Sequence, residues 1–474
     1  MSDIVVRGSA MTRLSCKVLI LGGGPGGYVC GIRAGQLGLD TIVVESNKLG
    51  GTCLNVGCVP SKALIHAADE FHRSVHDHSM KALGISLSGA TIDFAKTAEW
   101  KDGIVNKLNS GVGSLLRKSK VRVLSGTGKM IDGKTCRIVV DGQVQEITAE
   151  HVVIATGSEP VALPGLPFGG RIISSTEALS LTAIPKSMVV VGGGYIGVEL
   201  GTAFAKLGCR VTLVEASSRL LPQYDADLVR PVADSLKAFG IEVLLGAKAE
   251  ANDKDDTKLS VVASDGARRD ITADYFLVTA GRRARIEGWG CEQLDLQKKG
   301  SHLAIDSECR TSMRNVWAIG DVTGEPMLAH RGMAQGRMVA ELIAGLNRTF
   351  DPACIPAVCF SDPEIVTVGL SPDEARKDNA NVKVAKFPFL ANARALTAGS
   401  EQGFVRVVCR EEDHRILGIQ AVGRGVAELA AAFSLAIETG CRAEDVAMTI
   451  HAHPTLSEAL QEAALGVLGE ALHI

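Results

Sequence analysis

The chain has 474 residues, of which 46% are hydrophobic and 22% are charged, and its formal net charge is −3. This length is too great for one hydrophobic core, so we expect three or four packed domains. Without an excess of basic residues, binding to nucleic acid or to an anionic membrane is disfavoured.

The N-terminal segment predicts the compartment. Residues 1–10 carry no pattern, and we expect them to form a disordered extension. The apolar run at 18–21 stops at a glycine cluster, so it is too short for a signal peptide or a membrane span. We therefore expect a cytoplasmic protein. Thiols stay reduced there, so a disulfide among the 12 cysteines would be catalytic rather than structural.

An internal repeat sets the expected architecture. Residues 17–45 and 187–215 align without a gap, and each reads as a strand, a glycine-rich turn, a helix and a second strand that ends in an acid. The shared positions are Gly22, Gly24, Gly27, Gly31, Gly38 and Glu45 in the first copy and Gly192, Gly194, Gly197, Gly201, Gly208 and Glu215 in the second. This pattern is typical of dinucleotide-binding folds. Glycine-rich turns without a ligand are the alternative.

The chemistry of each copy follows from its residues. The glycines allow a tight turn and close approach of a pyrophosphate, and the helix N-terminus offers free N–H groups. Glu45 and Glu215 can accept hydrogen bonds from a ribose diol. Two such folds imply two dinucleotides. The carboxylate at position 215 would repel a 2′-phosphate and favours NAD over NADP, although Arg219 leaves NADP open.

Three later segments predict strands that return to these sheets, at 151–157, 275–281 and 315–321. We expect their ends, at Thr156, Gly157, Gly281 and Asp321, to face the dinucleotides. After about residue 350, alternating strands such as 403–409 and then long helical stretches predict an α+β domain.

A cysteine pair follows the first repeat. Cys53 and Cys58 lie among glycines and precede Pro-Ser-Lys and a helix that we expect from Ala63 to Arg73. A helix N-terminus stabilises a thiolate, which favours a reactive pair. Cys354 and Cys359 have the same spacing without such a helix, and we interpret them as ordinary buried thiols.

The segment 50–62, GGTCLNVGCVPSK, resembles the redox-disulfide motif of the class I pyridine nucleotide-disulfide oxidoreductases. The resemblance runs from about residue 15 to the C-terminus. It implies FAD in the first fingerprint and NAD in the second, with Asp321 on the ribityl chain of the flavin. It also implies that Cys53 exchanges with substrate and that Cys58 lies against the flavin.

Three further residues match family positions. The resemblance implies that Lys62 and Glu199 pair near the flavin ring and that Tyr195 shields the nicotinamide pocket. The alternatives are a solvated helix lysine, an exposed helix carboxylate and a tyrosine that covers a sheet edge.

The C-terminal segment 451–458, HAHPTLSE, offers a base. His453 can deprotonate a thiol, and Glu458 can fix its tautomer. Alternatively, Thr455 and Glu458 form a helix capping box, and we interpret His451 as a packing residue. The family motif implies that His453 is the acid–base and that it serves the cysteines of the second subunit of a homodimer.

Leu54, Ser61 and the pair Leu456–Ser457 favour the branch of the family that oxidises dihydrolipoamide with NAD, and the chain lacks the terminal cysteines of the mercuric-reductase branch. Its expected partner is the lipoyl domain of a 2-oxo acid dehydrogenase acyltransferase, or the glycine cleavage carrier protein. The alternatives are an NAD(P)H-dependent reductase of another disulfide or of a metal, and a flavin-binding structural subunit.

The predicted fold is α/β, with two Rossmann-like domains and a C-terminal α+β dimerisation domain. We expect an FAD domain over 1–158 and 283–352, an NAD domain over 159–282 and a dimerisation domain over 353–474.

Overall fold

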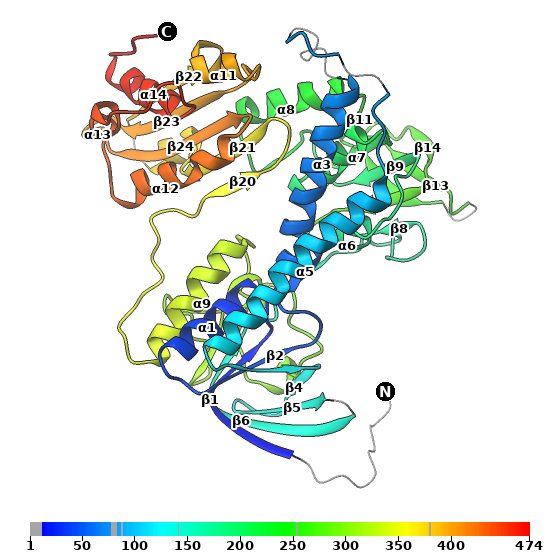
Figure 1. Ribbon diagram of the computed structural model, residues 1–474, viewed down its shortest axis with the longest axis vertical. Coiled ribbons are helices and arrows are strands. Elements are labelled where there is room, and N and C mark those ends of the chain that lie inside the picture. Colours follow the sequence, from blue (N-terminus) through cyan, green and yellow to red (C-terminus); the bar gives the residue numbers. More distant parts are fainter. Residues whose placement is uncertain (1–11, 77–82, 87–88, 141, 253–254, 379–380) are drawn as a thin grey trace. The chain divides into compact units, whose positions relative to one another are not determined.

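The computed structural model describes residues 12–76, 83–86, 89–140, 142–252, 255–378 and 381–474 (Figure 1). The extension predicted at 1–10 lies outside these residues. The chain forms two compact units. The first comprises Met1–Ala63, Ala98–Val161 and Gly281–Asp351, and the second comprises Leu64–Thr97, Ala162–Ala280 and Pro352–Ile474. The four-part division into domains stays a prediction.

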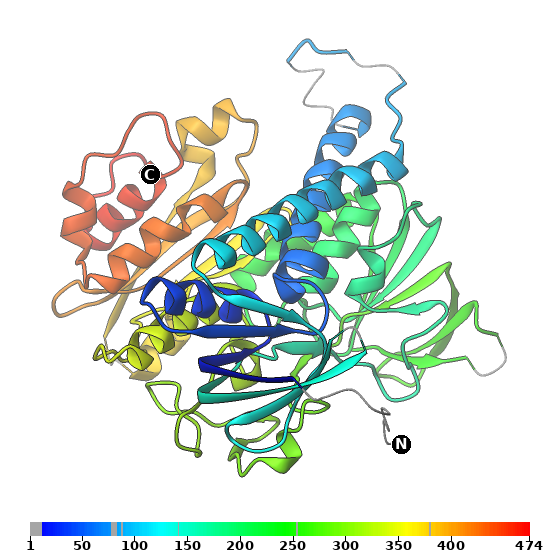
Figure 2. The ribbon, with the colours of Figure 1, turned by 60° about the horizontal axis from the view of Figure 1, so that its bottom comes forward.

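The first unit is built on a seven-stranded sheet of order β3-β2-β1-β6-β5-β4, with β19 also paired to β6. Figure 2 shows its first strands in dark blue beside the cyan strands that follow. The strands are β1 (Thr12–Leu21), β2 (Thr41–Glu45), β3 (Arg122–Ser125), β4 (Gly128–Met130), β5 (Thr135–Val140), β6 (Gln143–Ile154) and β19 (Val316–Ala318). β1, β2, β3, β6 and β19 run parallel, as a dinucleotide-binding sheet requires.

Two helices of this unit, α1 (Pro25–Gln36) and α9 (Ala329–Ile343), lie side by side (Figure 1). Glycines permit this contact, because a Cβ at Gly336 would lie 2.3 Å from the carbonyl oxygen of Gly26. Smaller elements complete the unit: α2 (Gly51–Val56), β7 (Ser158–Pro160), β16 (Arg282–Ala284), η1 (Cys291–Gln293), β17 (Lys298–Lys299), β18 (His302–Leu303) and η2 (Gly320–Thr323). The helices α3 (Cys58–His76) and α5 (Phe94–Lys118) contribute residues to both units.

The second unit has two halves, and we call the one formed by Ala162–Ala280, which contains the second fingerprint, the nucleotide half. It holds a parallel sheet of order β11-β10-β9-β15-β8 and a small antiparallel sheet, β12-β13-β14. Its strands are β8 (Ile172–Ile173), β9 (Ser187–Val191), β10 (Arg210–Glu215), β11 (Glu242–Leu245), β12 (Lys248–Ala251), β13 (Lys258–Val262), β14 (Arg268–Thr272) and β15 (Tyr275–Val278). Its helices are α6 (Ser175–Ala178), α7 (Tyr195–Lys206) and α8 (Ala226–Ala238).

The C-terminal half of the second unit is an antiparallel sheet of order β20-β21-β24-β23-β22 with helices packed on it. The strands are β20 (Ala357–Cys359), β21 (Glu364–Gly369), β22 (Val382–Pro388), β23 (Phe404–Arg410) and β24 (Ile416–Gly423). The helices are α10 (Pro372–Asp378), η3 (Phe389–Ala391), α11 (Ala393–Thr397), η4 (Val426–Leu429), α12 (Ala430–Glu438), α13 (Ala443–Met448) and α14 (Glu458–Leu468). The predicted fold class, two Rossmann-like folds and an α+β domain, is therefore confirmed.

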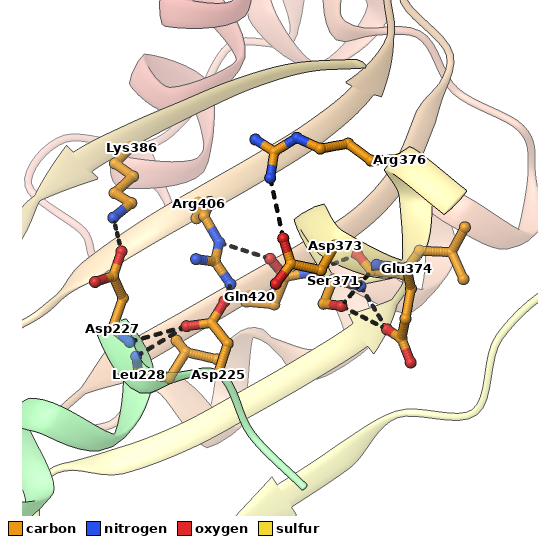
Figure 3. Close-up of polar contacts among 11 residues, drawn as sticks. Asp225, Asp227, Leu228, Ser371, Asp373, Glu374, Arg376, Lys386, Arg406 and Gln420 are labelled. Carbon is orange, nitrogen blue, oxygen red and sulfur yellow. Dashed lines mark hydrogen bonds and ion pairs between the residues drawn. The ribbon is translucent and has the colours of Figure 1, made fainter. Parts of the chain in front are cut away.

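Polar contacts join the two halves of the second unit (Figure 3). The guanidinium group of buried Arg406, on β23, pairs with Asp225 and donates to Gln420 Oε1 at 2.8 Å. Asp225 also caps α8 by accepting hydrogen bonds from the backbone of Asp227 and Leu228. One carboxylate therefore starts a helix of the nucleotide half and neutralises a cation in the C-terminal sheet.

The predicted elements are present, with four shifted boundaries. The strands expected at 151–157, 275–281 and 315–321 are β6, β15 and β19, each ending about three residues early. The helix expected from Ala63 begins at Cys58, because Pro60 falls in the first turn, where its missing N–H costs nothing. Among the described residues, no helix is long and apolar enough to cross a membrane.

Candidate active site

In the first fingerprint, the second and third glycines, Gly24 and Gly27, have different surroundings. A Cβ at Gly27 would lie 1.8 Å from the carbonyl oxygen of Gly22, so only glycine fits there. A Cβ at Gly24 would meet only the Cα of Gly51, at 3.8 Å, so the space above this residue is open. Gly24 is the N-cap of α1 and makes no side-chain cap, which leaves the first N–H groups for a ligand. This shape fits a dinucleotide pyrophosphate.

The second fingerprint repeats this arrangement in the second unit. A Cβ at Gly197 would lie 2.0 Å from the carbonyl oxygen of Gly192, whereas a Cβ at Gly194 would meet no atom within 4 Å. Gly194 is the uncapped N-cap of α7. Each unit therefore carries one open glycine loop at a helix N-terminus.

The acid at the end of each second strand binds the glycine loop. Glu45 Oε2 accepts from the N–H of Gly23 at 2.7 Å, and Glu215 Oε2 accepts from the N–H of Gly193 at 2.6 Å. Sequence reasoning missed this bond, which fixes each carboxylate beside the turn. It adds to the predicted ribose contact, which stays a proposal.

The charge of Glu215 bears on the choice of nucleotide. Burial alone would raise the pKa of Glu215, but hydrogen bonds from Ser217 and Gly193 hold it below its ordinary value. An ionised carboxylate there disfavours a 2′-phosphate. Arg219, the residue that left NADP open, donates to the carbonyl oxygen of Pro222 in its own turn.

The two cysteines lie at neighbouring helix starts in the first unit. Cys53 is the third residue of α2, and Cys58 is the first residue of α3, where the helix dipole favours a thiolate. The hydrogen bond with Cys58 and burial raise the pKa of Cys53, whereas the charge of Lys62 lowers it and Asp321 raises it. Burial and the hydrogen bond between the two sulfurs therefore favour the protonated form of Cys53.

Asp321 and the turn after β6 lie in the same unit as the two cysteines. Thr156 Oγ1 donates to the carbonyl oxygen of Arg285 at 2.8 Å. Gly157 and Gly281 have positive φ angles of 73° and 131°, and a Cβ on either would meet no atom within 4 Å. Asp321 Oδ2 accepts from Ser158 Oγ at 2.6 Å. The structure thus brings Cys53, Cys58, Lys62 and Asp321 into one electrostatic group.

Tyr195 and Glu199 lie on α7 in the second unit. Tyr195 is the first residue of the helix and is 37% exposed. Glu199 is only 3% exposed, and its Oε1 accepts from the N–H of Phe360 at 2.9 Å. The alternative that Glu199 is an exposed helix charge is therefore wrong. The role of Tyr195 at the nicotinamide pocket and that of Glu199 near the flavin ring stay proposals.

His453 and Glu458 form the predicted pair. His453 Nδ1 lies 2.9 Å from Glu458 Oε1, while Glu458 Oε2 accepts from the N–H of Thr455 at 2.8 Å. Burial alone would raise the pKa of Glu458, but these two hydrogen bonds hold it below its ordinary value. The ionised carboxylate fixes a proton on Nδ1 and leaves Nε2 of the imidazole, whose side chain is 71% exposed, able to accept one.

The capping alternative is only partly present at this place. α14 begins at Glu458 with Ser457 as its N-cap, and Thr455 Oγ1 donates to the carbonyl oxygen of Ala452 instead of capping the helix. His451 is half-buried, and its Nε2 has no hydrogen-bond partner among the described residues. The comparison pair Cys354 and Cys359 lies in the second unit, where Cys359 is buried and Cys354 is half-buried.

Comparison with known families covers nearly the whole chain. Residues 16–336 match the family described as pyridine nucleotide-disulphide oxidoreductase. Residues 355–464 match its dimerisation domain. The two matched segments include both fingerprints, the cysteine pair and the His453–Glu458 pair.

Individual relatives are similar over the same length. The chain is 55% identical to the dihydrolipoyl dehydrogenase of Pseudomonas aeruginosa over 462 residues, which covers 97% of this chain and 99% of the relative. It is 44% identical to that of Geobacillus stearothermophilus, with 97% and 98% covered. Among solved structures, LpdA from Mycobacterium tuberculosis matches with a TM-score of 0.87 and 26% identity, covering 96% of this chain and all of that one.

Proposed function

Because this chain belongs to the pyridine nucleotide-disulphide oxidoreductase family, we propose that it oxidises dihydrolipoamide to lipoamide with NAD as acceptor, as a dihydrolipoyl dehydrogenase. The observation that carries the proposal is the hydrogen-bonded pair Cys53–Cys58 in the unit that holds the first open glycine loop. The full-length relatives support the choice of dihydrolipoamide over other dithiols.

FAD and NAD are the cofactors of this reaction. Gly22, Gly24, Gly27, Glu45 and Asp321 would hold FAD in the first unit, together with Lys62, Thr156 and Gly157. Gly192, Gly194, Gly197, Glu215 and Gly281 would hold NAD, and Tyr195 would shield its nicotinamide pocket. The resemblance to the family assigns Glu199 to the flavin ring. When bound, the flavin would supply an acceptor for the electron pair of the enzyme dithiol and a donor of hydride to NAD.

The sulfur chemistry belongs to the chain itself. A thiolate of dihydrolipoamide attacks Cys53 of the oxidised pair, and the Cys53–Cys58 bond breaks with its electrons going to Cys58. The second substrate thiolate then attacks the mixed disulfide, which closes the lipoyl disulfide and leaves Cys53 reduced. The substrate thus loses two electrons and two protons, and the enzyme disulfide becomes a dithiol.

His453 takes the substrate protons one at a time at Nε2 and passes each to a reduced cysteine, because a thiol must ionise before it attacks a disulfide. Glu458 orients the imidazole and stabilises its charged form through the 2.9 Å contact. The match to a dimerisation domain supports a homodimer. By resemblance to the family, His453 of one subunit serves the cysteines of the other.

The substrate arrives on another protein. We infer that the partner is the lipoyl domain of a 2-oxo acid dehydrogenase acyltransferase or the carrier protein of glycine cleavage. We also place the enzyme in the cytoplasm, where thiols such as the free, buried Cys30 and Cys309 stay reduced.

The first test is formation of NADH from dihydrolipoamide and NAD by the purified, flavin-loaded protein. We expect rapid turnover, and we expect none from Cys53→Ser or Cys58→Ser, although both variants should retain flavin. Cys354→Ser is the matched control, because Cys354 and Cys359 have the same spacing as Cys53 and Cys58. This variant should keep full activity. A flavin-loaded wild type that reduces only other disulfides with NADPH would contradict the proposal.

A further inference from the structure

A chain of hydrogen bonds, which we call the relay, connects Asp321 through Ser158 to Arg282. Asp321 Oδ2 accepts from Ser158 Oγ at 2.6 Å, and Ser158 Oγ in turn accepts from Arg282 Nε at 2.9 Å. A second nitrogen of the guanidinium group donates to the backbone oxygen of Ser158, also at 2.9 Å. The relay therefore runs from a cation through a hydroxyl group to a carboxylate.

The relay is built into a rigid frame. Ser158 lies on β7 and Arg282 on β16, two strands that pair antiparallel with Arg282 opposite Pro160. Ser158 is buried, so water cannot easily replace Asp321 as the hydrogen-bond acceptor of its hydroxyl group. Because a cationic donor polarises the hydroxyl group, the bond to Asp321 is stronger than one from an isolated serine.

A separate anchor holds the backbone that carries Asp321. Arg331, buried on α9, donates to the carbonyl oxygen of Gly324 at 2.6 Å and to Thr323 Oγ1 at 3.0 Å. Gln335 Oε1 accepts from the N–H of Gly320 at 2.8 Å. With the backbone fixed by α9, the orientation of the Asp321 side chain depends on Ser158.

We propose that Ser158, oriented by Arg282, is a positioning residue for Asp321, so that the carboxylate presents its other oxygen, Oδ1, to a flavin ribityl hydroxyl group. The inference rests on the proposed function, because it concerns the flavin site. The proposal also implies that the Arg282 side chain lies on the face of β16 that is turned toward the flavin. Its neighbour Arg283 points elsewhere, since it pairs with Glu159 at 2.8 Å and is exposed.

The test is titration of the apoenzyme with FAD, followed by the flavin absorbance spectrum. We expect Ser158→Ala to raise the dissociation constant of FAD about tenfold, because one charge-assisted hydrogen bond is lost. Ser158→Thr keeps the hydroxyl group and should stay close to wild type. Arg283→Gln is the matched control for Arg282→Met. Only Arg282→Met should weaken the binding of FAD.

A double-mutant cycle separates positioning from general destabilisation. In the Asp321→Asn background, Ser158→Ala should change FAD binding little, because the interaction it removes is already altered. Equal tenfold effects in both backgrounds would overturn the relay, as would wild-type affinity in Ser158→Ala. If Ser158→Ala does not fold, the same cycle with Arg282→Met decides. A wild type that binds no FAD would instead overturn the proposed function itself.

Discussion

At the residue scale, the second and third glycines of the NAD fingerprint differ in what a methyl group would meet. At Gly194 it would enter open space, where we place the pyrophosphate. At Gly197 it would lie 2.0 Å from the carbonyl oxygen of Gly192 and 2.7 Å from Thr279 Oγ1. Gly194 therefore serves a ligand, and Gly197 serves the packing of α7.

This difference predicts two distinct defects. Gly194→Ala should fold normally and raise the KM for NAD about tenfold, because only ligand approach is obstructed. Gly197→Ala should cost about 2 kcal/mol of unfolding free energy, because backbone atoms must shift. Steady-state kinetics and thermal unfolding of the two holoenzymes distinguish them. Equal loss of thermal stability in both variants would contradict the assignment.

His453 allows a sharper kinetic prediction. In His453→Gln, the reduction of the enzyme by dihydrolipoamide should slow by about 100-fold or more, because no base takes the thiol proton. Oxidation of the reduced flavin by NAD should change little, since it needs no substrate thiolate. Stopped-flow measurement of the two half-reactions checks this. Equal slowing of both half-reactions would show that His453 is not the base.

At the element scale, the sequence predicts local patterns better than distant contacts. Both fingerprints and the helices after them follow from glycine spacing and hydrophobic runs within some thirty residues. The 124-residue separation between Ser158 and Arg282, or 161 between Glu199 and Phe360, has no periodic signal. Such pairs depend on which strands become neighbours. Glu199 is recognisable only through the family motif, and Ser158 is not recognisable at all.

The junction between Asp225 and Arg406 gives a prediction about stability. Asp225→Ala should cost about 3 kcal/mol, because it leaves a buried guanidinium group unpaired and removes the N-cap of α8. The control is Lys386→Met, which breaks the half-exposed pair with Asp227 and should cost less than about 1 kcal/mol. Thermal unfolding of the two holoenzymes measures the difference, and equal shifts would contradict this account.

At the scale of the whole molecule, the chemical groups are divided between the two compact units. The cysteine pair and the first glycine loop belong to the first unit, whereas the second loop and the His453–Glu458 pair belong to the second. The C-terminal sheet that carries this pair matches a dimerisation domain. By resemblance to the family, we propose that a complete thiol site combines the cysteines of one copy with the base of another.

Mixing of inactive subunits tests this inference. A Cys53→Ser subunit retains its base, and a His453→Gln subunit retains its cysteines, so a mixed dimer would contain one intact site. Because random pairing makes half of the dimers mixed, denaturation and renaturation of an equal mixture should restore about a quarter of wild-type activity. Each variant renatured alone should stay inactive. If base and cysteines served each other within one chain, the mixture would stay inactive as well, since neither chain holds both groups.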